Sequence, residues 1–274
     1  DDQLVFLETQ EGNLEIVEIY RLNWAVVALI IFILLAVIFA GRRGLASFVG
    51  LVATVATLVG FIVPQILDGK DPLLVSLVGG SIVSIVSIYL AHGLYTRTTI
   101  AVVATIASIV FAAVFATVFV GLTALFGLGS EEALFIQSGG LGEIDLRGIL
   151  LGGIIIGTLG VLDDITTTQA ATIEQLHLSD PKATLKELYH RGQSVGVEHI
   201  SSLINTLVLA YAGASFPIFI LLVANNQEPL WFTLNNEYFI EELVRTIVGS
   251  ATLILAVPIS TLLAAWWYTR ARHG

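Results

Sequence analysis

The most constraining feature of this sequence is a series of seven long apolar stretches, each long enough to cross a lipid bilayer as a helix. A spanning helix needs about 20 apolar residues. The stretches cover residues 24–40, 45–67, 73–92, 99–126, 148–176, 195–223 and 243–268. Only 12% of all residues are charged, whereas soluble domains have about 25%. We therefore predict an all-α integral membrane protein with a seven-transmembrane helical bundle.

The N-terminal segment, residues 1–22, has a different pattern. Its runs 3–8 and 13–20 mix strand-forming apolar residues with acids, which is typical of β-strands. We predict an extracytoplasmic segment with the remnant of a small β element, followed by a transmembrane domain over residues 23–274. Because the first residue is Asp1 and not Met, we expect a processed or shortened form of a longer chain.

The basic residues indicate the orientation of the bundle. Eight of the twelve Lys and Arg residues lie on one side of the predicted spans, and they are Arg42, Arg43, Arg97, Lys182, Lys186, Arg191, Arg270 and Arg272. Short loops rich in Lys and Arg stay in the cytoplasm. This pattern predicts that the N-terminus lies outside and that the C-terminus is cytoplasmic.

Two adjacent acids, Asp163 and Asp164, interrupt the fifth apolar stretch. A charge at the centre of a membrane helix costs about 2.5–3.5 kcal/mol even on a lenient scale. Two neighbouring carboxylates repel each other, so we expect one of them to bind a proton. Asp164 shares a helix face with Thr167 and Thr168. The leading hypothesis is a proton or cation relay, and the alternative is a structural carboxylate satisfied by hydroxyl and backbone groups.

The sixth stretch carries the predicted partners of these acids. If the fifth helix leaves the membrane near residue 176 and the sixth enters near residue 195, Asp164 and Asn205 lie about 18 Å and 15 Å along their helices. Since the two helices are antiparallel, we expect both residues at similar depth in the centre of the bundle. Glu198 is predicted to be the inner end of the path. His199 can titrate near neutral pH, although a surface position would also explain it.

The segment between these spans, residues 180–192, is predicted to form an interfacial elbow helix. Asp180 can cap such a helix and Pro181 suits its first turn. Lys182 and Lys186 would then face water while apolar residues rest in the headgroup region of the membrane lipid.

Five short motifs stand out along the chain, and they are Gly160-Val-Leu-Asp-Asp, His190-Arg-Gly-Gln, Ile204-Asn-Thr-Leu-Val-Leu-Ala-Tyr, Gly213-Ala-Ser-Phe-Pro217 and Val257-Pro-Ile-Ser. Together these motifs resemble the YibE/F family of bacterial membrane proteins. The resemblance covers nearly the whole chain and implies a multi-pass protein of the bacterial cytoplasmic (inner) membrane.

The pairing of an Asp-Asp run with Asn205-Thr206 on the next span is also similar, more distantly, to SecD/SecF proteins and RND-type transporters. That resemblance implies an RND/SecF-like core in which Asp164 belongs to a proton-coupled path. The sequence departs from the SecF pattern in a Gly-to-Asp spacing that is one residue shorter. We also expect no large periplasmic domain within these 274 residues.

The resemblance to RND-type transporters also implies a partner for this chain. Their membrane domains pair two similar halves and this chain has one, so we expect a homodimer. A small-residue stripe in the third span is the candidate contact, and packing within one subunit explains it equally well. The stripe consists of Gly80, Ser84, Ser87 and Ala91.

The remaining observations exclude several classes of function. The chain has no Cys, hence no thiolate metal site, and no phosphate-binding glycine loop for a nucleotide. We expect no cofactor, no nucleic acid and no enzyme activity, because both acids lie on one helix and no HExxH motif occurs. A catalytic Ser–His pair formed by Ser81 and His92 is also excluded, because the two residues would lie about 16 Å apart on their helix.

We therefore predict a proton- or cation-coupled transporter, or a subunit of one, whose partners are lipid and protons or small cations. One alternative is a non-catalytic membrane assembly or scaffold protein. A divalent-cation transporter is the other, although adjacent Asp side chains project about 100° apart on a helix and do not readily chelate one ion.

Overall fold

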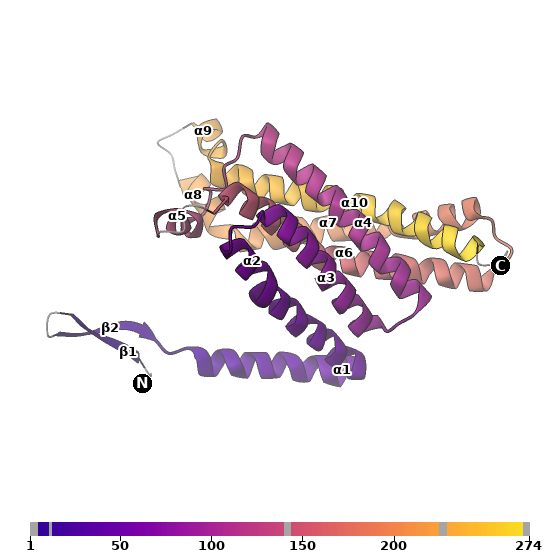
Figure 1. The fold of residues 1–274 in the computed structure, drawn as a ribbon, viewed down its shortest axis with the longest axis horizontal. Helices are drawn as coiled ribbons and strands as arrows, with labels where there is room; N and C mark the ends of the chain where they lie inside the picture. Colours follow the sequence, from indigo (N-terminus) through magenta and orange to yellow (C-terminus); the bar gives the residue numbers. More distant parts are fainter. Residues whose placement is uncertain (1–4, 11–12, 140–143, 225–228, 271–274) are drawn as a thin grey trace. The chain divides into compact units, whose positions relative to one another are not determined.

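The computed structural model describes residues 5–10, 13–139, 144–224 and 229–270. It divides the chain into two compact units, residues 1–49 and 50–274. Seven of the described helices are long and apolar enough to span a membrane, as predicted (Figure 1). They are Leu22–Arg42, Gly44–Leu67, Pro72–His92, Thr96–Leu122, Leu146–Ser179, Leu185–Ala214 and Glu237–Arg270. The protein is thus a helical, multi-pass membrane protein.

The N-terminal unit begins with a β-hairpin. Strand β1 (Val5–Gln10) pairs antiparallel with β2 (Asn13–Ile19), with a register irregularity between Phe6 and Leu7. The first span follows as the start of α1 (Leu22–Thr57). The division between the units at residue 49 falls later than the boundary at residue 22 that the sequence predicts.

Helix α1 is interrupted at Gly41, where the backbone has φ 57° and ψ −135°. A residue with a Cβ is strained in this region, whereas glycine adopts it readily. The interruption divides α1 into the first span and the start of the second. The second span continues through a π-helical turn, η1 (Leu58–Ile62), into α2 (Val63–Leu67). Pro64 has no N–H for the regular helical ladder, which accounts for the wider turn before it.

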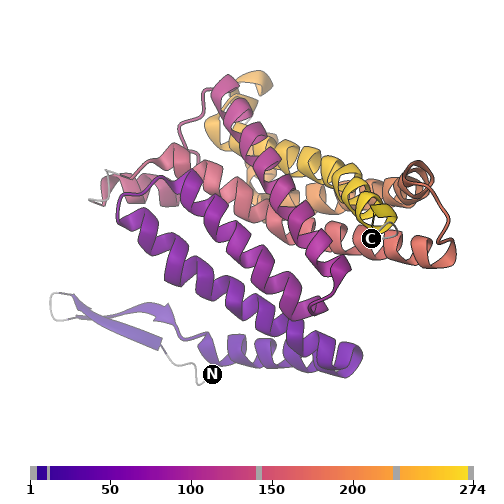
Figure 2. The ribbon, with the colours of Figure 1, turned by 45° about the vertical axis from the view of Figure 1, so that its right-hand side comes forward.

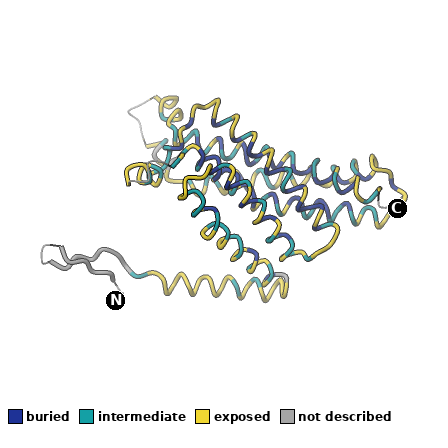
Figure 3. The backbone as a smooth tube through the Cα atoms, viewed as in Figure 1, coloured by how far each residue is buried: buried dark blue, intermediate teal, exposed yellow. Residues whose placement is uncertain are grey.

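Four long helices form the core of the C-terminal unit. They are α3 (Pro72–His92), α4 (Thr96–Leu122), α6 (Leu146–Ser179) and α10 (Glu237–Arg270). Helix α6 packs against the other three (Figures 1 and 2). Buried residues concentrate along these helices (Figure 3). The shorter α5 (Glu131–Ser138) and α9 (Leu230–Leu234) lie in the connections. Because α6 is central, groups at its middle are far from either end of the bundle.

The small-residue stripe of the third span is used inside the subunit. Gly80 and Ser84 are buried, and a Cβ at Gly80 would lie 3.2 Å from Cδ1 of Leu159 in α6. Ser87 lies beside Gly50 of the second span, whose added Cβ would be 3.6 Å from the Ser87 Cα. Of the two uses that the sequence leaves open for this stripe, the structure shows packing within the subunit for Gly80, Ser84 and Ser87.

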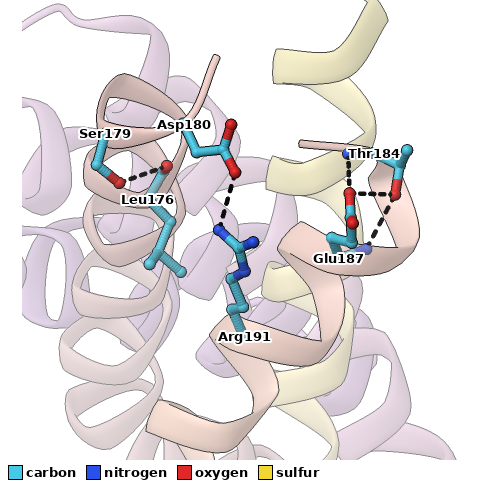
Figure 4. Close-up of polar contacts among 6 residues, drawn as sticks. All are labelled: Leu176, Ser179, Asp180, Thr184, Glu187 and Arg191. Carbon is cyan, nitrogen blue, oxygen red and sulfur yellow. Dashed lines mark hydrogen bonds and ion pairs between the residues drawn. The ribbon is translucent and has the colours of Figure 1, made fainter. Parts of the chain in front are cut away.

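The connection between α6 and α7 (Leu185–Ala214) differs from the predicted elbow helix. Asp180 is the C-cap of α6 and does not cap a helix at Pro181; its carboxylate accepts a hydrogen bond from Arg191 at 3.2 Å (Figure 4). The cap of α7 is Thr184, which forms a reciprocal capping box with Glu187 (Figure 4). Residues 185–192 are consequently the first turns of a continuous α7, and residues 180–184 form the turn.

The predicted span 195–223 is also divided at its other end. Helix α7 ends at Ala214, and α8 (Phe216–Ala224) begins a new helix with Pro217 in its first turn. Proline favours the first turn of a helix and breaks a helix interior. The break ends the sixth span at Ala214, and this span begins at Leu185, earlier in the chain than predicted.

Candidate functional site

The two intramembrane acids lie at the middle of α6, which has 34 residues. Each is about 25 Å along the helix from its ends. Asp163 is half-buried and Asp164 is exposed on the surface of the subunit. Within the described part of the chain, neither acid forms an ion pair. The chain thus places two carboxyl groups at the centre of a membrane span without a compensating cation.

Asp163 points toward the interface of α6 with α3. Its carboxyl group lies next to the hydroxyl group of Ser84. Asp163 Oδ1 and Ser84 Oγ are buried, and among the described residues neither atom has a hydrogen-bond partner with good geometry. A buried polar atom without a partner costs about 1–3 kcal/mol, which is unusual in a native interior. Asp163 and Ser84 are therefore two buried polar groups that lie side by side between α6 and α3.

The hydroxyl groups around the acids donate their protons to the helix backbone. Thr167 Oγ1 donates to the carbonyl oxygens of Asp163 at 2.8 Å and of Asp164 at 3.1 Å. On α7, Ser201 and Thr206 donate in the same way, at 3.3 Å and 3.0 Å. Thr168 is half-buried, and its carbonyl oxygen accepts from Thr172 at 2.9 Å. A hydroxyl has one proton, so these groups present mainly acceptor lone pairs to their surroundings.

Contacts between α6 and α7 establish their antiparallel register. Gly192 lies against Ile173, Gly196 against Gln169, and Gly157 against the Tyr211 hydroxyl group. By this register Asp164 is level with about residues 201–204 of α7, and Asn205 is within one turn of it. The predicted match in depth thus agrees with the register.

The orientation of α7 differs from the prediction. Helix α6 is central, and 56% of the residues in its most apolar 18-residue segment are buried. In the corresponding segment of α7 only 11% of the residues are buried. The predicted path residues on α7, Glu198, His199 and Asn205, are exposed on the subunit surface. No hydrogen bond joins Asn205 to Asp164 in the described part of the chain. The expectation that both helices lie at the bundle centre is therefore wrong for α7, whose apolar side already packs on α10.

Exposed residues of α6 and α7 form what we term the α6–α7 polar face. Its members share exposure on two neighbouring antiparallel helices. They are Gly153, Gly157, Gly160 and Asp164 of α6 with Glu198, His199, Ser201, Ser202, Asn205 and Thr206 of α7. Asp163 is the residue next to Asp164 in the sequence, and its side chain lies between this face and the interior of the bundle.

A preformed metal site is not part of this arrangement. Over the described ranges, no three His, Asp or Glu side chains come together as metal ligands. The two acids themselves diverge, one toward α3 and one toward the polar face. A single subunit therefore offers carboxyl and hydroxyl oxygens in succession and not as one chelating cluster.

Sequence reasoning missed Gln169, which lies on α6 near the acids. Its side chain is 1% exposed. Nε2 donates to the Gly192 carbonyl oxygen of α7 and to Thr261 Oγ1 of α10, both at 2.7 Å. The sequence signal for this residue is an amide side chain that follows three consecutive threonines within an apolar helix. Gln169 joins three helices next to the acids and so holds the site in place.

Replacing Gln169 with leucine should destabilise the subunit by about 1–2 kcal/mol, because the Gly192 carbonyl oxygen would lose its side-chain donor. Thermal unfolding in detergent would measure the change. Gln175→Leu is the matched control, since Gln175 is exposed on the same helix. Equal unfolding temperatures for both variants would contradict a linking role for Gln169.

Taken together, these features define a multi-pass helical membrane protein whose central helix carries two carboxyl groups within the span. The sequence matches the family described as YibE/F-like protein over residues 28–270. The chain therefore belongs to the YibE/F family, which confirms the resemblance seen in the sequence. Comparison with curated proteins and with solved structures found no match.

Proposed function

We propose that this protein is a proton- or cation-coupled transporter, or a subunit of one, and that the α6 carboxyl groups bind the coupling ion. The observation that carries the proposal is the position of Asp163 and Asp164 at the middle of the central span with no ion pair among the described residues. Ionisable residues inside a membrane are costly, and they commonly mark ion and proton pathways.

The chemistry of the surroundings supports this proposal. Thr167, one turn along α6 from the acids, donates its hydroxyl proton to their backbone carbonyl oxygens, and Ser201 and Thr206 donate within α7. Among the described residues, these hydroxyl groups therefore donate to the helix backbone and not to the carboxyl groups. Such a site gains from a proton on one acid or from a small cation, since either supplies the missing positive charge.

The order of the residues suggests a route for the ion. Glu198 is level with about Thr167 in the α6–α7 register, one turn from Asp164 toward the end of the bundle that contains Arg97 and Lys186. We propose that this end faces the cytoplasm of a bacterial cell, so that the N-terminus is outside. In this scheme Glu198 and His199 exchange the ion with the cytoplasmic side, and Asp164 passes it to Asp163.

An infrared experiment tests ion binding without knowledge of the transported substrate. Difference spectra of the reconstituted full chain would be recorded as pH or Na⁺ concentration changes. We expect a protonated carboxyl band that changes in the wild type and is absent from the Asp163→Asn/Asp164→Asn variant. The same band in the double variant, or no change with either ion, would favour a scaffold with structural acids.

A further inference from the structure

We infer that a second copy of this chain covers the α6–α7 polar face, about a two-fold axis along the membrane normal. The dimer would complete the site around Asp164. This inference rests on the proposed function only for the role of the site, since the need for a cover follows from polarity and exposure alone.

The first step is that lipid cannot cover this face. Asp164 lies at the middle of a span and is exposed, and Asn205 lies within one turn of its level. A charged group facing hydrocarbon costs about 2.5–3.5 kcal/mol even on a lenient scale, and exposed polar groups there need partners. The serine and threonine members add to the same strip. The face therefore requires a polar or protein neighbour.

The second step is that the other apolar helices of the chain cannot supply these partners. Residues 25–40 of the first span contain no polar side chain, and α8 is apolar throughout. Helix α3 and helix α4 use their small and polar residues inside the bundle, as Gly80 and Ser84 illustrate. A cover built from either apolar segment would leave Asp164 without a hydrogen-bond partner.

The third step identifies the occupant as a second copy. All copies insert with the same orientation, so a two-fold axis must run along the membrane normal and residues at equal depth face each other. The Asn205 amide has both a donor and an acceptor, so it can pair reciprocally with Asn205 of the partner subunit. The Asn205 side chains of two copies can therefore form hydrogen bonds with each other at the same depth in the membrane.

A separate observation on α6 agrees with close approach of another helix. A Cβ added at Gly153 or Gly160 would meet nothing within 4 Å in the subunit. Small residues at membrane helix interfaces let two backbones come together. By contrast, Gly152 on the neighbouring face is already filled by α3. Gly153 and Gly160 belong to the α6–α7 polar face, and between them Gly157 lies against the Tyr211 hydroxyl group of α7.

Disulfide cross-linking in native membranes tests the interface directly, because the chain has no Cys. Asn205→Cys and Ser202→Cys are placed on the face, and Val110→Cys on α4 is the control, since Val110 is 54% exposed near the middle of its span. We expect a band of twice the subunit mass on oxidation for the two face variants and not for the control. No such band for either face variant, an equal band for Val110→Cys, or a product with a protein of another mass would overturn the inference.

A second measurement does not depend on introduced thiols. Native mass spectrometry in mild detergent should give a dimer for the wild type and a monomer for Gly153→Leu, whose side chain fits the subunit but fills the interface. A wild-type monomer would also overturn the inference. A dimer whose infrared spectrum does not change with pH or Na⁺ would reject the proposed ion binding and support the proposed interface. A monomer whose spectrum does change would support ion binding and reject the interface.

Discussion

Proton- or cation-coupled flux through proteoliposomes should fall by about tenfold or more when Asp164 is replaced by asparagine. A tenfold change corresponds to only about 1.4 kcal/mol, which is less than the cost of one charge at the centre of a membrane helix. Asparagine has nearly the same shape as aspartate, but it cannot take up and release a proton. Asp163→Asn should have an effect of similar size, because both acids belong to the proposed relay.

The control for this prediction is Asp145→Asn at the N-cap of the same helix. Asp145 precedes α6, is exposed, and makes no side-chain capping hydrogen bond. It carries the same charge but lies outside the middle of the span. Flux would be followed with a pH indicator inside the vesicles while pH and cation gradients are imposed. Full flux in Asp164→Asn, or an equal loss in Asp145→Asn, would move the path away from the centre of α6.

The number and type of the spans could be predicted because the bilayer imposes a simple length rule. Each of the seven apolar stretches corresponds to one of the seven helical spans of the structure. The N-terminal strands were predicted for the same kind of reason, since strand-forming residues alternate with acids, and β1 and β2 occupy Val5–Gln10 and Asn13–Ile19. Gly41 and Pro217 then set the interruptions through their backbone geometry.

The start of α7 shows where local signals compete. Asp180-Pro181 has acceptable capping chemistry, but Thr184 followed by Glu187 satisfies two backbone donors in a reciprocal box. The structure uses the second signal, which leaves Asp180 to pair with Arg191. A comparison of both candidate caps in the sequence would have favoured Thr184.

The direction in which α7 presents its polar residues could not be predicted from the sequence. Glu198 and Asn205 produce the same helical pattern whether they face the bundle interior or a second subunit. The decisive facts are tertiary, since Gly192 and Gly196 bring the opposite side of α7 against Ile173 and Gln169. Only the packed structure therefore shows that Asp164 of α6 and the polar side of α7 both lie on the surface of the subunit.

Two consecutive glycines of α6 provide the sharpest test of how this helix divides its contacts. Gly152→Leu should destabilise the subunit by about 3 kcal/mol and reduce folded protein in the membrane. A Cβ at Gly152 would lie 3.2 Å from the Ser76 Cβ and 3.3 Å from the Pro72 carbonyl oxygen of α3, in addition to its contact with the Ser76 hydroxyl group. Helix α3 would have to move away from α6 to admit a leucine.

Gly153→Leu is the matched variant, with the same substitution one residue further along. Nothing lies within 4 Å of a Cβ at Gly153, so the unfolding temperature of the separated subunit should stay equal to that of wild type or rise, since leucine favours the helix over glycine by about 0.8 kcal/mol. Thermal unfolding of both variants in detergent that separates subunits would measure this difference. If Gly153→Leu lowered the unfolding temperature as much as Gly152→Leu, another part of the same subunit would have to pack against this side of α6. Asp164 lies on the same side, two turns beyond Gly157. It would then belong to the interior of the subunit and not to an interface.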